Sequence, residues 1–339
     1  MDNTKITDCT IIGGGPAGLY ASFYAGMRDL SVRLIEVKET LGGKLHFYPE
    51  KRIWDIGGMP PTHGADVMSY LKEQGTLFDP EIILKEKIVN IEKLKENLFK
   101  VISESGACYY SRSVIIAVGG GLVSPRKLAM HKASHYEQTN LHYRIFRIED
   151  FSRKKVVIVG GGNSAIDWAN ELKETADELH LIHRNDTFRA HESQLRKLKE
   201  SNVAIHSYTS IETLIPDDQG TDIQAIEVRN SQTGQLFTLS LDELIVNIGF
   251  DSEPNFYQEK TLKLNLKDNY YIEGNTQMQT SVEGIYAIGD IVDYEGKVRL
   301  IAGAFQDAIN AVNQIKSTLL PAETPEVIMS SFHKGLQEK

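Results

Sequence analysis

The hydrophobic positions of this chain predict the same succession of elements twice. Residues 7–12 and 156–159 are short apolar runs rich in β-branched residues, which is typical of buried parallel strands. Each run is followed by a glycine-rich turn, then by a segment with apolar residues at helical spacing, and then by a second strand. The second strands are predicted at 31–36 and 178–183. The pattern therefore predicts two strand–helix–strand units and an α/β fold.

Each unit is followed by a predicted β-meander and by one further strand that ends near a glycine. In the first half these strands lie at 99–103, 107–110 and 113–118. In the second half they lie at 225–229, 237–239 and 243–247. We interpret the end of the last strand in each half as one of two paired crossings between domains, where a hinge is expected.

The fold class that follows is α/β, with two Rossmann-like dinucleotide-binding domains, one inserted into the other. At 339 residues the chain exceeds the size at which a single hydrophobic core keeps growing. Residues 1–118 and 248–339 are predicted to form one discontinuous domain. Residues 119–247 are predicted to form the inserted domain.

Composition is that of a soluble protein, which we expect to be cytoplasmic. Apolar residues make up 41% and charged residues 24% of the chain, and no stretch approaches the roughly 18 uninterrupted apolar residues of a membrane helix. Residues 1–8 lack the basic segment and apolar core of a secretory signal. The only cysteines, Cys9 and Cys108, lie far apart and are expected to be reduced structural thiols, with Cys9 packed inside the first strand.

The charge of the chain argues against one class of partner. A formal net charge of −9 disfavours nonspecific binding of nucleic acid, which depends on clustered Lys and Arg. An acidic partner is not excluded, because short basic stretches at 126–132 and 153–155 could form a positive patch. We interpret each of them as solvated surface charge. No metal site is predicted.

The first glycine-rich turn has the pattern of a dinucleotide-binding site. In Gly13-x-Gly15-x-x-Gly18 the first glycine permits the tight turn, the second lets backbone approach a pyrophosphate, and the third lets helix and strand pack closely. The helix that follows directs unpaired N–H groups and a partial positive charge at the phosphates. Glu36 ends the next strand, where its carboxylate can accept hydrogen bonds from ribose hydroxyls. The alternative is a purely structural turn.

The second glycine-rich turn, at 160–165, has an alanine at the third position of the motif. The strand after its helix ends in His183-Arg184 instead of an acid, and Arg189 follows in the same loop. A 2′-phosphate needs positive, forked donors, which arginine supplies. This turn is therefore predicted to bind NADPH in preference to NADH. The alternative is that both arginines are ordinary surface cations.

A third segment suggests that the other nucleotide is a flavin. Gly289-Asp290 follows the apolar run 284–288, and from there the carboxylate could bind a ribitol hydroxyl. Residues 300–308 are predicted to begin a helix whose backbone donors face the flavin pyrimidine. The alternative is a plain capped helix.

Together these segments resemble the thioredoxin-reductase-like flavoproteins over nearly the whole chain. The segments are Gly13–Gly18, Gly160–Ala165, His183–Arg189 and Tyr286–Asp290. Those reductases carry a Cys-x-x-Cys just before the second glycine turn, whereas residues 148–159 contain no cysteine. Residues 41–44, 48–51, 55–58 and 167–169 instead resemble the cysteine-free branch, the ferredoxin–NADP⁺ reductases of thioredoxin-reductase type.

The resemblance implies a homodimer in which the tail of one subunit covers the flavin of the other with a ring. His333 is the ring that matches best, with Phe332 beside it, and Tyr48 matches the aromatic residue on the opposite flavin face. The family usually has two adjacent arginines after the histidine of the NADPH loop, and Asn185 stands at the second, so a weaker preference for NADPH is expected. From the residues alone, Tyr48 could be a core or loop tyrosine and His333 could lie in a disordered tail.

The predicted site combines these motifs with the resemblance. The FAD set is Gly13, Gly15, Pro16, Ala17, Gly18, Glu36, Gly43, Lys44, Tyr48, Val89, Asp290 and Ala304. The NADPH set is Gly160, Gly162, Asn163, Ser164, Ala165, His183, Arg184 and Arg189. Tyr48, Phe332 and His333 are the flavin-stacking candidates. No classical acid–base side chain is expected, because the flavin carries the chemistry.

The leading hypothesis is hydride transfer from NADPH to flavin N5, followed by release of single electrons to ferredoxin or flavodoxin. A second hypothesis is an NAD(P)H oxidase, peroxidase or small-molecule disulfide reductase of the same fold, of which the last two would need a reactive cysteine. A third is a nucleotide-responsive binding protein whose FAD is structural or sensory. The sequence leaves open the choice of carrier and the direction of electron flow.

Overall fold

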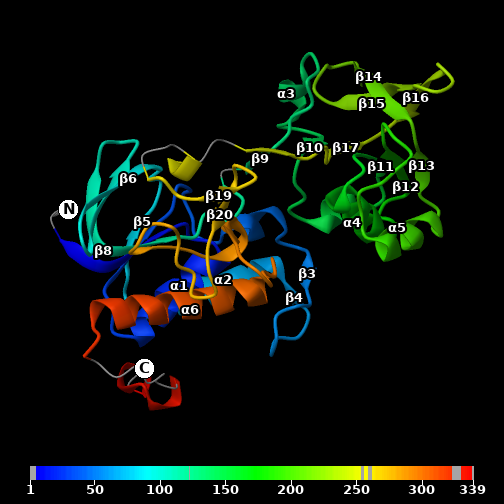
Figure 1. Cartoon of the computed structure of the whole chain (residues 1–339). Helices are drawn as coiled ribbons and strands as arrows, with labels where there is room; N and C mark the ends of the chain where they lie inside the picture. Colours follow the sequence, from blue (N-terminus) through cyan, green and yellow to red (C-terminus); the bar gives the residue numbers. More distant parts are fainter. Residues whose placement is uncertain (1–4, 122, 253–255, 259–261, 323–329, 338–339) are drawn as a thin grey trace. The chain divides into compact units, whose positions relative to one another are not determined.

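The structure is a computed structural model that describes residues 5–121, 123–252, 256–258, 262–322 and 330–337. The chain divides into two compact units (Figure 1). Residues 1–122 with 252–339 are called the split unit, and residues 123–251 the inserted unit. The sequence predicts these boundaries at 118/119 and 247/248. Among the described residues, no helix combines the length and apolar character needed to cross a bilayer.

A parallel sheet forms the core of the split unit. Its strands are β1 (Ile6–Ile12), β2 (Val32–Ile35), β5 (Glu81–Ile83), β8 (Cys108–Ile116) and β21 (Ile285–Ala287). They lie in the order β5-β2-β1-β8, and β21 pairs with β8. Ile12 is aligned with Ile35 on one side and with Ile116 on the other. The chain thus changes direction across the sheet at β1, and the carboxyl edge at such a point is where ligands bind in open α/β sheets.

β8 is one continuous strand where the sequence predicts two. Its first half pairs antiparallel with β7 (Leu98–Ser103), which pairs in turn with β6 (Ile88–Lys95), and its second half belongs to the parallel sheet. The polar residues that suggest a break are satisfied inside the sheet. Ser111 Oγ donates to the Ser113 carbonyl at 2.7 Å, and Ser113 Oγ donates to the Asp8 carbonyl at 2.7 Å. Because these buried hydroxyls have partners, the strand continues through them.

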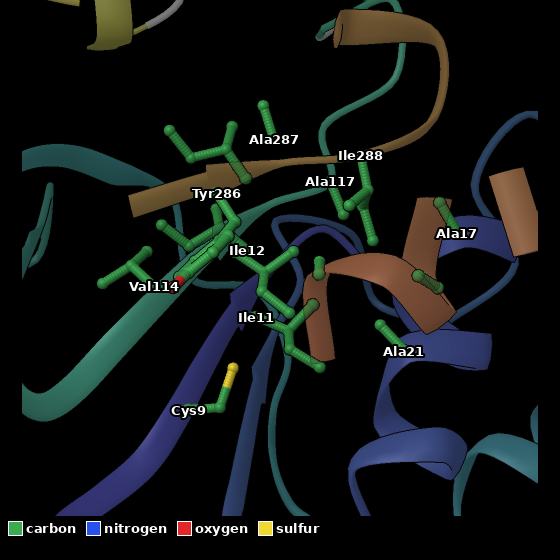
Figure 2. Close-up of a cluster of buried hydrophobic side chains, with 14 of the residues drawn as sticks. Cys9, Ile11, Ile12, Ala17, Ala21, Val114, Ala117, Tyr286, Ala287 and Ile288 are labelled. Atoms are coloured by element: carbon green, nitrogen blue, oxygen red, sulfur yellow. The ribbon is translucent and has the colours of Figure 1, made fainter. Parts of the chain in front are cut away.

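The helix α1 (Pro16–Met27) packs against both α2 (Gly64–Gly75) and α6 (Ile301–Leu319). Proline suits the first helical position, where its missing N–H has no partner to lose. Small residues let α1 approach β1 closely, and Figure 2 shows Ala21 of α1 and Ile11 of β1 in the shared core, with Cys9 further along the same strand.

The remaining elements of the split unit are short. They are η1 (Gly43–Phe47), β3 (Arg52–Ile53), β4 (Thr62–His63), η3 (Phe256–Gln258), β19 (Leu266–Lys267), β20 (Tyr271–Glu273), η4 (Gly289–Ile291), β22 (Val292–Asp293), η5 (Ser330–Phe332) and α7 (Lys334–Gln337). β3 and β4 form a hairpin, and β20 joins β19 to β22. Of these elements, η1 and η4 lie beside the candidate site described below.

The inserted unit has its own parallel sheet, in the order β10-β17-β11-β12-β13. The strands are β10 (Leu141–His142), β11 (Lys155–Val159), β12 (Glu178–Ile182), β13 (Ala204–His206) and β17 (Glu243–Val246). β12 and β17 lie on opposite sides of β11. The order in which the chain adds strands to the sheet therefore reverses at β11, as it does at β1 in the split unit.

Alternate residues of this sheet face two different layers. Val156 and Ile158 pack toward α4 (Asn163–Leu172) and α5 (Glu192–Lys199). Val157 packs toward an antiparallel sheet of β14 (Thr209–Pro216), β15 (Ile223–Asn230) and β16 (Leu236–Ser240), together with α3 (Ala133–Tyr136). The turn η2 (Ile148–Phe151) adds Phe151 to the helical side. The inserted unit thus has hydrophobic packing on both faces of its own sheet.

The two crossings between the units pair with each other. β9 (Val123–Pro125) and β18 (Phe250–Ser252) form a two-stranded sheet. The Arg126 N–H donates to the Gly249 carbonyl at 2.9 Å, and the Arg126 side chain forms an ion pair with Asp251 at 2.9 Å. The other basic stretch is paired as well, since Lys154 lies 2.5 Å from Glu243. These contacts agree with surface charge rather than a basic binding patch.

Candidate functional site

The first glycine turn lies at the carboxyl edge of the split unit's sheet, directly after β1. Gly13 adopts a φ of +110°, and a Cβ there would lie 2.5 Å from the Ala117 carbonyl oxygen. A Cβ on Gly18 would lie 1.9 Å from the Gly13 carbonyl oxygen. Larger residues would therefore disrupt the turn itself or separate α1 from it, which agrees with the roles that the motif predicts.

Gly15 differs from its neighbours because a Cβ there would clash with nothing. It is the N-cap of α1, its φ of −79° suits any residue, and a Cβ there would meet only the Gly43 Cα, at 3.6 Å. Gly43 has a φ of +59°, and a Cβ on it would come within 2.7 Å of Gly15 Cα. Two backbone segments thus approach each other at the start of α1, whose first N–H groups lack partners within the helix. A pyrophosphate fits this cradle, which any side chain would narrow.

Glu36 is buried immediately after β2, where the motif predicts it. Its Oε2 accepts a hydrogen bond from the Gly14 N–H at 2.7 Å, and its Oε1 accepts one from the Lys38 N–H at 2.9 Å. A carboxylate has about four acceptor positions. Glu36 therefore holds the turn in place and retains capacity for ribose hydroxyls.

Asp290 lies beside the same glycine turn, although it is distant in sequence. Its carboxylate forms an ion pair with Lys44 at 3.1 Å. The preceding Gly289 has a φ of +76°, and a Cβ on it would lie 3.0 Å from the Ala17 Cβ. The structure thus brings together Lys44, Asp290 and the start of α1, three parts of the predicted FAD set.

Ala304 is buried in the first turn of α6, and its N–H donates to the carbonyl of the N-cap Leu300 at 3.0 Å. The N–H groups that precede it in this turn have no acceptor within the helix. α6 packs against η4, which contains Asp290. The predicted helix start is therefore correct, and it contacts the turn that holds Asp290.

A buried ionic cluster below η4 is absent from the predicted set. The Asp307 carboxylate has no solvent exposure. It accepts hydrogen bonds from the Gly289 N–H at 2.9 Å and from the Tyr294 hydroxyl at 2.8 Å, and it pairs with the buried ammonium of Lys297. Burial and the neighbouring carboxylate raise the pKa of Tyr294 to about 12. No motif in the sequence indicates that these side chains meet.

Tyr48 and Val89 have no recorded contact with the glycine turn. Tyr48 is half-buried at the end of η1, with the Lys51 ammonium 5.9 Å from its ring centre. Val89 lies at an irregularity of β6, between Ile88 and Asn90. Their places in the FAD set stay predictions.

The tail ring His333 packs on its own chain. It is buried, and its ring centre lies 5.1 Å from that of Phe78 in an edge-on contact. Phe78 packs against Gly26, near the end of α1 that is remote from the glycine turn. The structure thus places His333 away from the FAD cradle of the same chain. Phe332 is the last residue of η5, and the placement of its side chain lies outside what the structure describes.

The second glycine turn follows β11 in the inserted unit. Gly160 has a φ of +153°, and a Cβ on it would lie 2.3 Å from the Asn247 carbonyl oxygen and 2.9 Å from the Ala165 Cβ. Gly162 is the N-cap of α4, and a Cβ there would meet nothing within 4 Å. As in the first turn, a Cβ at the position next to the helix start would clash with nothing. Asn163 and Ser164 then begin α4, where Asn163 Oδ1 accepts the His191 N–H at 2.9 Å.

The loop after β12 folds back onto this turn. The His183 ring lies against Gly161, whose Cβ would fall 2.2 Å from it, and His183 Nε2 donates to the Thr187 carbonyl at 3.2 Å. The Arg189 N–H donates to the Gly161 carbonyl at 2.8 Å. The Arg184 and Arg189 side chains are exposed, and among the described residues neither guanidinium has a hydrogen-bond or ion-pair partner. The backbone of Arg189 thus lies beside the turn, and both guanidinium groups are exposed to solvent.

An acidic residue that the prediction omits lies in the same loop. Asp186 accepts hydrogen bonds from the Tyr208 and Thr187 hydroxyls, which lower the pKa of its carboxyl group. The group is therefore ionised at neutral pH. A negative charge two residues from Arg184 would repel a 2′-phosphate. Like the neutral Asn185, which stands where a second arginine is usual, it would weaken the preference for NADPH.

The two cysteines form no disulfide, and Cys9 is inaccessible to solvent. Both are free, and Cys9 is fully buried in β1 as predicted. Burial raises the pKa of the Cys9 thiol to about 12, which suppresses the nucleophilic thiolate. Cys108 begins β8 and is half-buried.

Comparison with known proteins agrees with this geometry. Residues 7–314 match the family described as pyridine nucleotide-disulphide oxidoreductase. The chain belongs to this family. It shares the nucleotide-binding turns that the family name implies, but within the described residues it lacks a cysteine pair that could form a disulphide.

Relatives of this oxidoreductase are similar over its whole length. Ferredoxin–NADP reductase 1 of Bacillus licheniformis is 42% identical over 100% of this chain and 97% of its own. Ferredoxin–NADP reductase 2 of Exiguobacterium sibiricum is 45% identical over 100% of this chain and 96% of its own. The resemblance that the sequence analysis identifies is therefore confirmed.

Solved structures confirm the predicted fold class. Thioredoxin reductase of T. acidophilum matches with a TM-score of 0.75 at 22% identity, covering 93% of this chain and 99% of its own. Thioredoxin reductase of Lactococcus lactis matches with a TM-score of 0.74 at 22% identity and the same coverage. At this identity the likeness establishes a shared two-domain α/β architecture.

Proposed function

We propose that this protein is an FAD-dependent ferredoxin–NADP⁺ reductase. The observation that carries the proposal is similarity over the whole chain, at 42% and 45% identity, to relatives that bear this name. The proposal is supported by the two glycine turns, one in each unit, which would serve as separate sites for the two nucleotides that the reaction needs. The split unit would hold FAD and the inserted unit NADPH.

The side chains and backbone of this protein would bind and orient the two nucleotides. When bound, FAD supplies the redox chemistry, taking a hydride from NADPH and passing electrons singly to the carrier. In the split unit, Glu36 would hold the ribose, the start of α1 the pyrophosphate, and Asp290 the ribitol. In the inserted unit, Arg184 and Arg189 would hold the 2′-phosphate.

The proposed acceptor is ferredoxin, with flavodoxin as a second carrier of the same kind. The relatives' printed name supports ferredoxin. A carrier protein of this sort receives electrons without a disulphide intermediate, which agrees with the fully buried Cys9. We place the reaction in the cytoplasm.

We further propose a homodimer in which the tail ring, His333 or Phe332, covers the partner's flavin while Tyr48 covers the opposite face. Because His333 packs on Phe78 of its own chain in this structure, the tail would have to move to take this role. Light scattering should give the mass of a dimer, and truncation before Phe332 should change the rate at which NADPH bleaches the flavin. A monomer, or an unchanged rate, would contradict this part of the proposal.

An anaerobic titration tests the proposed function directly. NADPH should bleach the flavin absorbance of the purified protein faster than NADH, and oxidised ferredoxin or flavodoxin should restore it. The carrier that restores it faster is the better acceptor. Absence of bleaching would contradict a reductase of any kind. Bleaching that only oxygen or a small disulfide reverses would favour an oxidase or a disulfide reductase instead.

A further inference from the structure

The carboxylate of Asp307 connects two segments of the split unit that are predicted to contact the flavin. It lies on α6, three residues after Ala304 and therefore on the same side of the helix. It also accepts the N–H of Gly289, the residue directly before Asp290. A single buried group thus fixes the start of α6 against the turn that carries Asp290.

The ion pair that completes this cluster is costly by itself. The side chains of Lys297 and Asp307 are 2% and 0% exposed, so both charges lose nearly all contact with water. Burial of an ion pair seldom stabilises a fold more than apolar residues of similar volume would. A role in general stability is therefore a poor explanation for these charges. Their position below the Gly289–Asp290 turn offers a specific one.

Each oxygen of the Asp307 carboxylate accepts hydrogen bonds from its own donors. Tyr294 donates to Oδ1, while Gly289 and Lys297 donate to Oδ2. Because Tyr294 and Lys297 hold the carboxylate in place, its Oδ2 is a fixed acceptor for the Gly289 N–H. This hydrogen bond in turn fixes the orientation of the Gly289–Asp290 turn. The positive φ of Gly289 is compatible with this orientation because glycine lacks a Cβ.

We propose that Asp307 is a positioning residue for FAD, which orients the Gly289–Asp290 turn through its hydrogen bond to the Gly289 N–H. The inference rests on the proposed function, because it assumes that FAD binds in the split unit. Lys297 and Tyr294 hold the carboxylate in place, and none of the three side chains needs to touch the cofactor.

The test removes the whole cluster at once, so that no buried charge is left without a partner. Tyr294→Phe, Lys297→Met and Asp307→Leu are combined in one variant of the full chain. Its apoprotein should unfold near the wild-type temperature, whereas its dissociation constant for FAD should rise at least tenfold, measured by quenching of flavin fluorescence. The same variant with Asp307→Asn instead of leucine keeps an acceptor for the Gly289 N–H. It should recover most of the FAD affinity.

A control uses the ion pair of the buried Arg33 with the half-buried Glu81, at 2.9 Å in the same unit. The other described partners of Arg33 are the Lys5 and Tyr110 carbonyls and the Tyr109 ring, which lie outside the predicted FAD set. Arg33→Met with Glu81→Gln should alter the unfolding temperature without changing the FAD affinity of the folded protein. Wild-type FAD affinity in the leucine variant would overturn the inference. So would equal loss in the leucine and asparagine variants, which would indicate a merely structural role.

The outcome separates this inference from the proposed function. Binding of 2′,5′-ADP depends on the inserted unit and should be the same in every variant. If the wild-type protein fails to bind FAD, the proposed function fails as well. If the wild type binds FAD and the leucine variant binds it equally well, only the role of Asp307 is lost.

Discussion

Under the proposed function, the preference between NADPH and NADH would depend on a few charged side chains in the loop 183–189. Arg184 is exposed and free to bind a 2′-phosphate, but Asn185 and the ionised Asp186 follow it directly. A neutral donor and a negative charge both weaken the attraction for a phosphate relative to a second arginine. We therefore expect a moderate preference for NADPH that single substitutions can shift in either direction.

Arg184→Ala should raise the KM for NADPH about 10- to 100-fold, the loss expected for a charged hydrogen bond. The KM for NADH should change little, because NADH has no 2′-phosphate. Steady-state kinetics with both nucleotides and a carrier protein measure the two values. Arg196→Ala is a suitable control, since Arg196 is an exposed arginine on α5 of the same unit. Asn185→Arg should lower the KM for NADPH, and an increase would contradict the assigned location of the 2′-phosphate.

The thiol of Cys9 makes stability depend on alkaline pH. Its folded pKa of about 12 lies above the ordinary value of 9.0. Stability from this group is thus fully present below pH 9, and it falls by about 1.4 kcal/mol per pH unit between pH 9 and 12, where only the unfolded chain ionises. Cys9→Ala removes this dependence. Urea unfolding at pH 8 and 10.5 should therefore show a smaller loss in the variant, and an equal loss would contradict burial as the cause.

At the scale of elements, the glycines within each of the two turns differ in how closely the surrounding atoms pack against them. A Cβ on Gly18 would clash with the preceding turn, whereas a Cβ on Gly15, at the start of α1, would make only one ordinary contact, with Gly43 Cα at 3.6 Å. The same contrast holds between Gly160 and Gly162 in the inserted unit. One position in each motif is therefore required by the packing, while the other is the position that we propose for the approach of the nucleotide.

Gly15→Ala should leave the unfolding temperature of the apoprotein unchanged and weaken FAD binding at least about tenfold, because the new methyl group overlaps the pyrophosphate. Gly18→Ala should lower both the unfolding temperature and the affinity. Thermal unfolding without cofactor, followed by FAD titration, distinguishes the two variants. Equal FAD affinity in Gly15→Ala and the wild type would argue against phosphate binding at this helix start.

The sequence predicts those elements whose signals are local. The glycine turns, the acid at position 36 and the start of α6 at Ile301 all follow from short patterns, and the structure contains each of these features. The continuity of β8 does not follow from the sequence, because the polar residues Ser111 and Ser113 suggest that the strand ends there. Only the structure shows the buried hydrogen bonds of their hydroxyls. β14 is missed for a related reason, since its exposed face gives it little hydrophobic periodicity.

The Asp307 cluster shows why part of the site could not be predicted. Lys297 and Asp307 would ordinarily be assigned to the surface, because charged residues are rarely buried. Only the fold brings them together under the Gly289 turn. Likewise, the contact of His183 with Gly161 depends on a loop that returns to the turn, which residue spacing does not reveal.

At the scale of the whole molecule, the inserted unit is a contiguous segment with its own core. Its sheet is packed on one face by α4 and α5 and on the other by β14, β15 and β16. A domain with its own hydrophobic core can in principle fold alone. The segment 123–251 should therefore be separable from the rest of the chain.

A fragment of residues 123–251 should unfold cooperatively and bind NADP⁺, but not FAD. Circular dichroism on heating and isothermal titration with each nucleotide provide the measurements. The Arg184→Ala variant of the fragment serves as the control, and it should fold normally and bind NADP⁺ more weakly. Tight binding of FAD to the fragment would contradict the assignment of the two units.

The pairing of β9 with β18 has a consequence for how this protein could have evolved. Because the chain leaves and re-enters the split unit through adjacent strands, joined by the Arg126–Gly249 hydrogen bond of 2.9 Å, the inserted segment closes almost like a single loop. Closure of such a loop costs little additional entropy, whatever its content. Genetic recombination at these two points could therefore replace the inserted unit as one block while the parallel sheet of the split unit stays intact.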